Sequence, residues 1–257
     1  MDNRKDLPIA VIDSGVGGIS VLRELIRVMP GERFLYFGDS ENAPYGSRSR
    51  DEVLAITRRN LSFLREKGIK ALVIACNTAT SAAVKTLREE NPDLPIIGIE
   101  PAVKPAALLG EHPRVLVMAT PLTLREKKFL SLVARYQDRA EFIPLPCPRL
   151  AKLIESGNTE GPEIKEYLAA LLAPYQDQRI DAVVLGCTHY PHVKAEIAAH
   201  FPADTVILDG GEGTARETRR RVAELGLLRE GDEGCVEILN SSSDEAMIEI
   251  SKKLLYK

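Results

Sequence analysis

The most constraining feature of this sequence is the alternation of short apolar runs with longer amphipathic segments. The runs at 9–12, 71–75 and 183–185 are rich in branched residues and too short for core helices, which is typical of strands buried in a parallel sheet. The stretch 49–67 instead repeats its apolar residues at helical spacing. This alternation predicts an α/β fold with two mostly parallel sheets flanked by helices.

Two of the predicted strands end in a cysteine. Ala71–Ala75 leads into Cys76, and Val183–Gly186 leads into Cys187. Aligning 69–71 with 180–182 brings the two cysteines into register. Open α/β sheets bind ligands at the carboxyl ends of their strands, so we expect both thiols in one ligand site.

The chain also shows a weak internal repeat. The strand at 114–118 matches the strand at 9–12, which puts Thr120 opposite Ser14. The pattern predicts duplicated βα units in two facing domains, related by a pseudo-twofold axis, with the active site in the cleft between them. The tail has no counterpart in the middle of the chain, so we expect it to pack on the N-terminal half. The predicted domains are therefore residues 1–98 plus 208–257, carrying Cys76, and residues 99–207, carrying Cys187.

Composition and charge narrow the class of protein. The chain has 44% hydrophobic and 28% charged residues and a formal net charge of -3, which gives no reason to expect nucleic acid as a partner. The sequence has no signal-peptide pattern and no apolar run near the ~20 residues of a membrane span, so no membrane partner is expected. The four cysteines are widely spaced without a CxxC pair. A cytoplasmic enzyme is the working prediction.

A glycine-rich turn, Asp13–Gly18, follows the first predicted strand and precedes a helix. Such a turn offers backbone N–H groups and a helix N-terminus to an anion. It lacks the third glycine of the dinucleotide fingerprint, so a small carboxylate ligand fits it better than a dinucleotide.

Two facing thiols suit one reaction in particular. Removing the α-hydrogen of an amino acid requires either an electron-sink cofactor, such as pyridoxal phosphate on a lysine, or acid/base groups on both faces of the carbon. No strand-end motif contains such a lysine, so we expect no cofactor. A thiolate is favoured by a helix N-terminus or a nearby cation. A helix start is predicted after each cysteine, and His189 lies two residues beyond Cys187. Asp13 is a candidate to assist Cys76.

The same residue types occur in metal sites and in buried cores. Cys187, His189 and His192 could be zinc ligands, but a fourth ligand is missing, so we expect no metal site. We interpret His192 as a helix-surface residue. Cys147 and Cys235 are expected to be inert.

The sequence resembles the bacterial glutamate racemases of the cofactor-independent aspartate/glutamate racemase superfamily. The matching segments are Asp13-Ser14-Gly15-Val16-Gly17-Gly18, Tyr36-Phe37-Gly38-Asp39, Pro44-Tyr45-Gly46, Ala75-Cys76-Asn77-Thr78-Ala79, Ile99-Glu100-Pro101 and Gly186-Cys187-Thr188-His189-Tyr190-Pro191. The resemblance implies conversion between L- and D-glutamate, the latter for peptidoglycan, with Cys76 and Cys187 as the acid/base pair. It also implies a homodimer.

The resemblance further implies a set of site residues. The auxiliary catalytic groups would be Asp13, Glu155 and His189. Substrate contacts would fall on Asp13, Ser14, Tyr45, Gly46, Asn77, Thr78, Thr120, Thr188 and His189. The chain departs from the family pattern at Pro121–Glu126 and at Asp209-Gly210-Gly211. Two alternatives stay open at this point: a racemase of aspartate or a related acid, and a non-catalytic ligand- or protein-binding paralogue.

Overall fold

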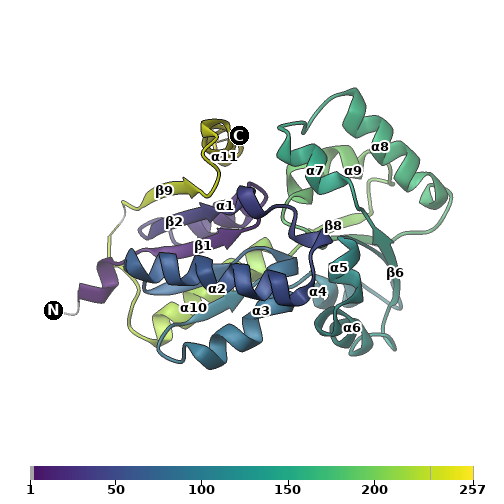
Figure 1. The fold of residues 1–257 in the computed structure, drawn as a ribbon. Helices are drawn as coiled ribbons and strands as arrows, with labels where there is room; N and C mark the ends of the chain where they lie inside the picture. Colours follow the sequence, from purple (N-terminus) through teal and green to yellow (C-terminus); the bar gives the residue numbers. More distant parts are fainter. Residues whose placement is uncertain (1–2, 232, 257) are drawn as a thin grey trace.

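Two parallel sheets, each in its own lobe, form the framework of the protein (Figure 1). The computed structural model describes residues 3–231 and 233–256. Every pair of neighbouring strands is parallel, so the predicted α/β fold is confirmed. In spatial order, the first sheet contains β4 (Ile96–Gly98), β3 (Ala71–Ile74), β1 (Ile9–Asp13), β2 (Arg33–Gly38) and β9 (Cys235–Asn240). The second contains β6 (Glu141–Pro146), β5 (Arg114–Ala119), β7 (Ala182–Leu185) and β8 (Val206–Asp209).

The two sheets have the same topology. When β1 to β4 are matched in turn with β5 to β8, both sheets have the same strand order, and β9 is an additional edge strand of the first. Ser14 and Thr120 then follow equivalent strands, as do Cys76 and Cys187. This equivalence supports the interpretation of the sequence as a duplication.

Helices cover both faces of the first sheet, so its strands are buried on both sides. One face packs against α1 (Ile19–Val28), α10 (Gly211–Glu224) and α11 (Glu245–Leu255). The other packs against α2 (Arg50–Glu66) and α3 (Asn77–Glu90). Ser49 begins α2 with a capping box to Glu52, which satisfies backbone donors that the first helical turn leaves free.

The second sheet is covered in the same way. One face packs against α7 (Leu150–Glu155), α8 (Pro162–Leu172), the 3-10 helix η5 (Tyr190–Val193) and α9 (Lys194–Ala198). The other packs against α4 (Val103–Ala107) and α6 (Lys127–Ala134). Shorter elements complete the chain: α5 (Pro121–Arg125), η1 (Asn3–Asp6), η2 (Ser40–Asn42), η3 (Tyr45–Ser47) and η4 (Ala173–Tyr175). None of the described helices combines the length and the apolar character needed to cross a bilayer.

The chain passes between the lobes twice, after β4 and after β8. The two connections touch at these crossings. A Cβ on Gly210, in the connection after β8, would lie only 2.3 Å from the carbonyl oxygen of Glu100, in the connection after β4. Only a residue without a side chain allows this approach. β8 pairs with β7 through Asp209, so the crossing comes after Asp209 rather than at 208. Beyond it, β9 pairs with β2 and α11 contacts α1.

A buried ion pair holds this returning segment on the first lobe. Lys70 Nζ lies 2.7 Å from Glu32 Oε2, and both side chains are almost fully buried. Glu32 also accepts a hydrogen bond from the backbone N–H of Arg229 at 2.8 Å, and Lys70 donates to the carbonyl of Lys5 at 2.7 Å. The pair thus joins the starts of β2 and β3 to both the N-terminal and the C-terminal segments.

Replacing Lys70 by Met should strongly destabilise the protein. The substitution keeps the aliphatic stem but leaves the Glu32 carboxylate buried without its cation, which costs about 3–5 kcal/mol. Chemical denaturation measures the loss. Lys85→Met is the control, because Lys85 and Glu89 are exposed and 3.9 Å apart, and such a pair contributes about 0–1 kcal/mol. Equal stability of the two variants would contradict the role of the pair.

Candidate active site

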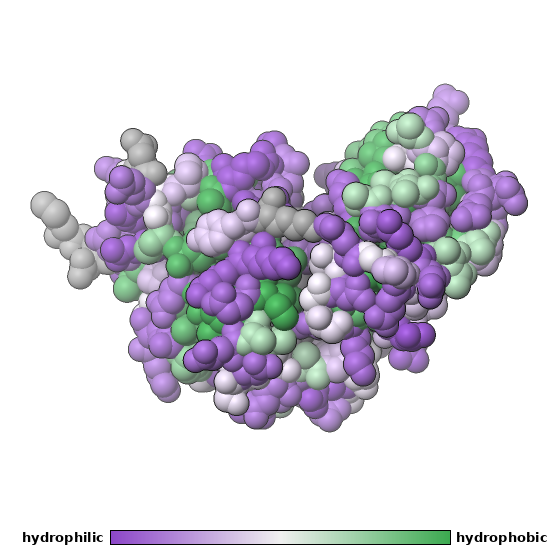
Figure 2. Space-filling view, turned by 90° about the horizontal axis from the view of Figure 1, so that it is seen from above, coloured by the Kyte–Doolittle hydropathy of each residue, from purple (hydrophilic) through white to green (hydrophobic). Residues whose placement is uncertain are grey.

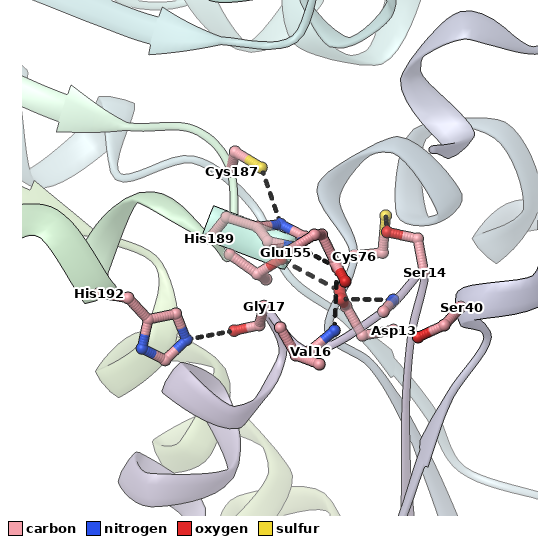
Figure 3. Close-up of polar contacts among 12 residues, drawn as sticks. Asp13, Ser14, Val16, Gly17, Ser40, Cys76, Glu155, Cys187, His189 and His192 are labelled. Atoms are coloured by element: carbon pink, nitrogen blue, oxygen red, sulfur yellow. Dashed lines mark hydrogen bonds and ion pairs between the residues drawn. The ribbon is translucent and has the colours of Figure 1, made fainter. Parts of the chain in front are cut away.

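Polar side chains from both lobes meet where the strands end (Figure 3). Asp13 is the last residue of β1, Cys76 follows β3 and Cys187 follows β7. In Figure 3, Cys76 lies beside Ser14 of the first lobe, and Cys187 lies beside His189 of the second. The carboxyl ends of the two sheets thus face one another, as expected of a ligand site in this class of fold.

Cys76 is the N-cap residue of α3. Its sulfur accepts a hydrogen bond from Ala79 N at 3.4 Å, and its thiol donates to Ser14 Oγ at 3.7 Å. The predicted helix N-terminus is therefore present, since α3 begins at Asn77, directly after Cys76. Burial and the negative charge of Asp13 outweigh the effect of the helix N-terminus and raise the pKa of the Cys76 thiol to about 12. In this closed state Cys76 is a thiol.

Cys187 has a different environment. No α-helix starts behind it, since residues 190–193 form the short 3-10 helix η5 and α9 begins only at Lys194. The predicted helix effect is thus absent here. Its sulfur lies instead 3.5 Å from Nδ1 of His189, so the expected basic neighbour is in place.

His189 and Glu155 form a buried ion pair between Nε2 and Oε1. Burial alone would lower the pKa of His189, but the charge of Glu155 and the hydrogen bonds to Cys187 and Glu155 hold it well above its ordinary value. Burial would likewise raise the pKa of Glu155, yet the charge of His189 lowers it. The imidazolium can therefore donate Nε2–H to Glu155 and Nδ1–H to the sulfur of Cys187.

The glycine-rich turn does bind a carboxylate, but one that belongs to the protein. Val16 N donates to Glu155 Oε1 at 3.0 Å, and Gly15 N donates to Asp13 Oδ2 at 3.1 Å. A Cβ on Gly15 would lie 1.9 Å from Glu155 Oε1, so glycine is required for this approach. Protein carboxylates thus accept hydrogen bonds from these two N–H groups, and a ligand carboxylate at other groups of the turn stays a prediction.

Asp13 connects the two lobes at the centre of the site. Its Oδ1 accepts a hydrogen bond from Thr188 Oγ1 at 3.1 Å. Burial raises the pKa of Asp13, and the charge of Glu155 adds to this, while His189 acts in the opposite direction. A carboxyl group with a raised pKa beside the Cys76 side of the site is suited to exchanging a proton there.

Threonine hydroxyls make a second contact between the lobes. Thr78 Oγ1 lies 3.3 Å from both Thr120 Oγ1 and Thr123 Oγ1, and Thr120 donates to Thr123 at 2.9 Å. Gly46 packs on the same group, with the Thr120 side chain 3.2 Å from where a Cβ would be. Thr78, Thr120 and Gly46 are thus brought together.

Tyr45 is buried, and its hydroxyl donates to Asp39 Oδ2 at 2.5 Å. Asn60 donates to the same carboxylate oxygen at 3.0 Å and to the Tyr45 hydroxyl at 3.1 Å. The hydroxyl is therefore held by the protein, and any ligand contact from this residue must come from its ring or backbone. This arrangement places Gly46 at the threonine contact.

One buried polar atom has no partner among the described residues near the site. The amide oxygen of Asn77, directly after Cys76, is buried and makes no hydrogen bond. A buried acceptor without a donor costs free energy. It is therefore suited to accept a hydrogen bond from the ammonium group of a ligand.

Several residues that support the site were not predicted from the sequence. Thr123 completes the threonine contact, Asp39 holds Tyr45, and the Tyr36 hydroxyl donates to Gly15 O at 2.6 Å. The position of Asp39 after β2 was the available signal.

His192 is not a helix-surface residue, because it lies partly buried between the lobes on η5. Cys147 is buried near Cys187, and Cys235 is exposed on β9.

The lobes are closed over the two sulfur atoms, since Cys76 is 6% and Cys187 8% exposed. A separate open cleft of about 660 Å³ lies between α11 and the α7–α8 turn. Seen from above, the surface is notched between the lobes (Figure 2). The cleft lining includes none of the predicted site residues: it is formed by Gly157, Thr159, Glu160, Ile250, Lys253, Leu254 and Tyr256.

Comparison with known proteins identifies the class. Residues 9–218 match the model of the Asp/Glu/Hydantoin racemase family. This protein belongs to that family.

Within the family, the chain is similar over its whole length to glutamate racemases. It is 49% identical to the glutamate racemase of Clostridium perfringens strain SM101, over 99% of this chain and 98% of that protein. The structure of glutamate racemase isoform RacE1 from Bacillus anthracis superposes with a TM-score of 0.88 at 30% identity, over 98% and 95% of the two chains. The Francisella tularensis glutamate racemase in complex with D-glutamate gives 0.84 at 26% identity, also over 98% and 95%.

Adding a methyl group at Gly15 should impair the site without unfolding the lobes. In Gly15→Ala the new Cβ displaces the Glu155 carboxylate from Val16 and from His189, and a shift of this size costs about a hundredfold in kcat. Steady-state racemase assays measure the effect. Gly213→Ala is the control, since nothing lies within 4 Å of a Cβ there. Full activity of Gly15→Ala would contradict the assigned contact.

The His189–Glu155 pair should give a defined pH dependence of stability. Because the folded-state pKa of His189 is raised, its contribution is complete below about pH 6.5, its ordinary value, and is lost as pH rises through the folded-state pKa. Glu155, whose pKa is lowered, contributes above about 4.5. We therefore expect the difference in unfolding free energy between wild type and Glu155→Gln to be largest between pH 4.5 and 6.5 and to decrease at higher pH.

Denaturation at a series of pH values measures this difference. Glu163→Gln is the matched control, because Glu163 is exposed and its carboxylate accepts a hydrogen bond from Asn158. A difference that grows above pH 6.5 would contradict the proton assignment.

Proposed function

We propose that this protein interconverts L- and D-glutamate by two-base chemistry at Cys76 and Cys187. The observation that carries the proposal is their placement after equivalent strands of two sheets with the same order, in lobes that face one another. The whole-chain similarity to glutamate racemases supports glutamate as the substrate. The structure of a similar racemase with D-glutamate supports it further.

In the proposed reaction the α-carbon of glutamate lies between the two sulfur atoms. One cysteine, as thiolate, takes the α-proton, and the electron pair of the C–H bond remains on the substrate as a carbanion. The opposite thiol then donates its proton to the other face, which inverts the stereocentre and leaves that sulfur as the thiolate. The reverse reaction exchanges the two roles.

The neighbouring residues assist each sulfur differently. Protonated His189 donates to Cys187 and is itself held by Glu155. Asp13 assists on the Cys76 side, where burial raises its pKa and so favours the protonated carboxyl group as a partner in proton exchange. Closure of the lobes excludes water from the carbanion.

Substrate recognition is assigned to the polar groups around the sulfurs. The free amide oxygen of Asn77 is suited to the α-ammonium group. The remaining proposed contacts come from both lobes, so binding of substrate favours closure of the lobes. These contacts are Asp13, Ser14, Tyr45, Gly46, Thr78, Thr120, Thr188 and His189.

The biological setting follows from this activity. We infer that the protein works in the cytoplasm and supplies D-glutamate for peptidoglycan, and thereby for cell wall biogenesis and cell shape. A homodimer is part of the proposal, and sedimentation equilibrium tests it. We also propose two domains, with the second crossing after Asp209 so that β8 stays intact.

Replacing either catalytic cysteine should separate hydrogen exchange from racemisation. Cys76→Ala or Cys187→Ala leaves only one acid/base group. Racemisation should fall by at least about a thousandfold, because each variant lacks either the base or the proton donor in both directions of the reaction. Each variant should still exchange the α-hydrogen of one enantiomer in D2O, and the enantiomer should differ between the two. Proton NMR of L- and D-glutamate with no cofactor added measures both processes.

Cys235→Ser serves as the control, because Cys235 is exposed and lies at the start of β9, opposite Arg33 at the start of β2 and not at the carboxyl ends of the strands. This variant should retain full activity. A fully active Cys76→Ala, Cys187→Ala double variant would overturn the two-thiol mechanism. Activity on aspartate but not on glutamate would overturn the substrate assignment.

A further inference from the structure

His192 makes a contact between the lobes that the proposed chemistry does not use. It is partly buried on η5, and its Nε2 lies 3.1 Å from the carbonyl oxygen of Gly17 in the first lobe. Figure 3 shows the ring directed at this carbonyl and away from both cysteines. Since a carbonyl can only accept, His192 donates through Nε2–H.

His192 is a neutral donor. Burial, together with the positive charges of His189 and Arg23, lowers the pKa of His192 to about 4, although Gly17 O and Glu155 act in the opposite direction. At neutral pH it therefore adds no second cation beside the imidazolium of His189. It contributes a hydrogen bond of fixed direction.

Gly17, which receives this bond, lies directly against the ring of His189. A Cβ on Gly17 would be 2.4 Å from His189 Nδ1 and 2.6 Å from its Cε1. The neighbouring residue Val16 binds Glu155, the partner of Nε2. The glycine-rich turn thus limits both the position of the His189 ring and that of its carboxylate partner.

Three contacts connect Gly17, His192 and His189 in a closed cycle. The His189 ring touches Gly17, the carbonyl of Gly17 receives the His192 side chain, and His192 N donates back to His189 O at 3.0 Å. Ser20 adds a parallel link, with its hydroxyl 2.8 Å from Thr188 O. A turn held in this way cannot withdraw from His189 without breaking the bond to His192.

We propose that His192 is a positioning residue for racemisation, acting through Gly17 to hold the His189 imidazolium in line with the Cys187 sulfur. This inference rests on the proposed function. The His192 side chain binds Gly17, which is not among the proposed substrate contacts, so its loss should lower kcat and leave KM nearly unchanged. The enantiomers have equal free energies, so kcat/KM must fall equally in both directions.

A pair of amide substitutions isolates the hydrogen bond. Gln places its N–H close to the position of His Nε2, whereas Asn is one methylene shorter and cannot reach Gly17. His192→Asn should lower kcat about tenfold, as expected for one lost hydrogen bond in a positioning contact, and His192→Gln should recover most of it. His200→Asn is the control, because His200 is also partly buried and hydrogen-bonded, to Gln176, and it should keep wild-type kcat.

A second readout needs no substrate. The proton between His189 Nε2 and Glu155 should give a far-downfield NMR signal that persists in His192→Gln and shifts or broadens in His192→Asn. Equal kcat in the two variants, or an unchanged signal in His192→Asn, would overturn the proposal. If the wild type failed to racemise glutamate, the proposed function would fall, while this signal would still decide whether His192 positions His189.

The wild-type protein provides a test that does not depend on folding of any variant. Nitrogen-15 NMR should find His192 neutral at pH 7, protonated on Nε2, with that proton protected from exchange. A cationic His192, or one protonated only on Nδ1, would contradict the assignment.

Discussion

The carboxylate of Glu155 is the contact on which the arrangement of the site depends. It is largely buried, accepts a hydrogen bond from Val16 of one lobe and pairs with His189 of the other. A buried charge is tolerated only with such partners, because desolvation is otherwise costly. The glycine-rich turn, the end of α7 and the strand end after β7 must therefore meet at one point. That requirement fixes the closed orientation of the lobes.

The two halves of the site are alike in topology and different in electrostatics. Cys76 neighbours Ser14 and the carboxyl group of Asp13, whereas Cys187 neighbours an imidazolium. Two-base chemistry requires groups on opposite faces of one carbon, and it does not require identical surroundings. The hydrogen-bonding neighbours also differ: the Cys76 sulfur accepts a hydrogen bond from Ala79 N, and the Cys187 sulfur lies beside Nδ1 of His189.

Local patterns predicted the elements better than their ends. The strand residues and the following cysteines were readable because buried parallel strands are short apolar runs. A helix start was predicted after each cysteine, but only Cys76 is followed directly by an α-helix, whereas a short 3-10 helix follows Cys187. The sequence did not reveal that Glu155, a residue far away in the chain, binds the glycine-rich turn through Val16 N.

The sequence by itself determined the α/β class, the repeated βα units and the two strand-end thiols, because these follow from periodicity and from residues adjacent in the chain. Only the tertiary structure decided which partner each polar group has. It pairs Glu155 with Val16 N, Thr188 with the Asp13 carboxylate and His192 with the Gly17 carbonyl, and it brings Thr123 into contact with Thr78 and Thr120. These contacts join residues from different lobes. Their geometry depends on how two separately folded sheets pack, and no local spacing encodes that.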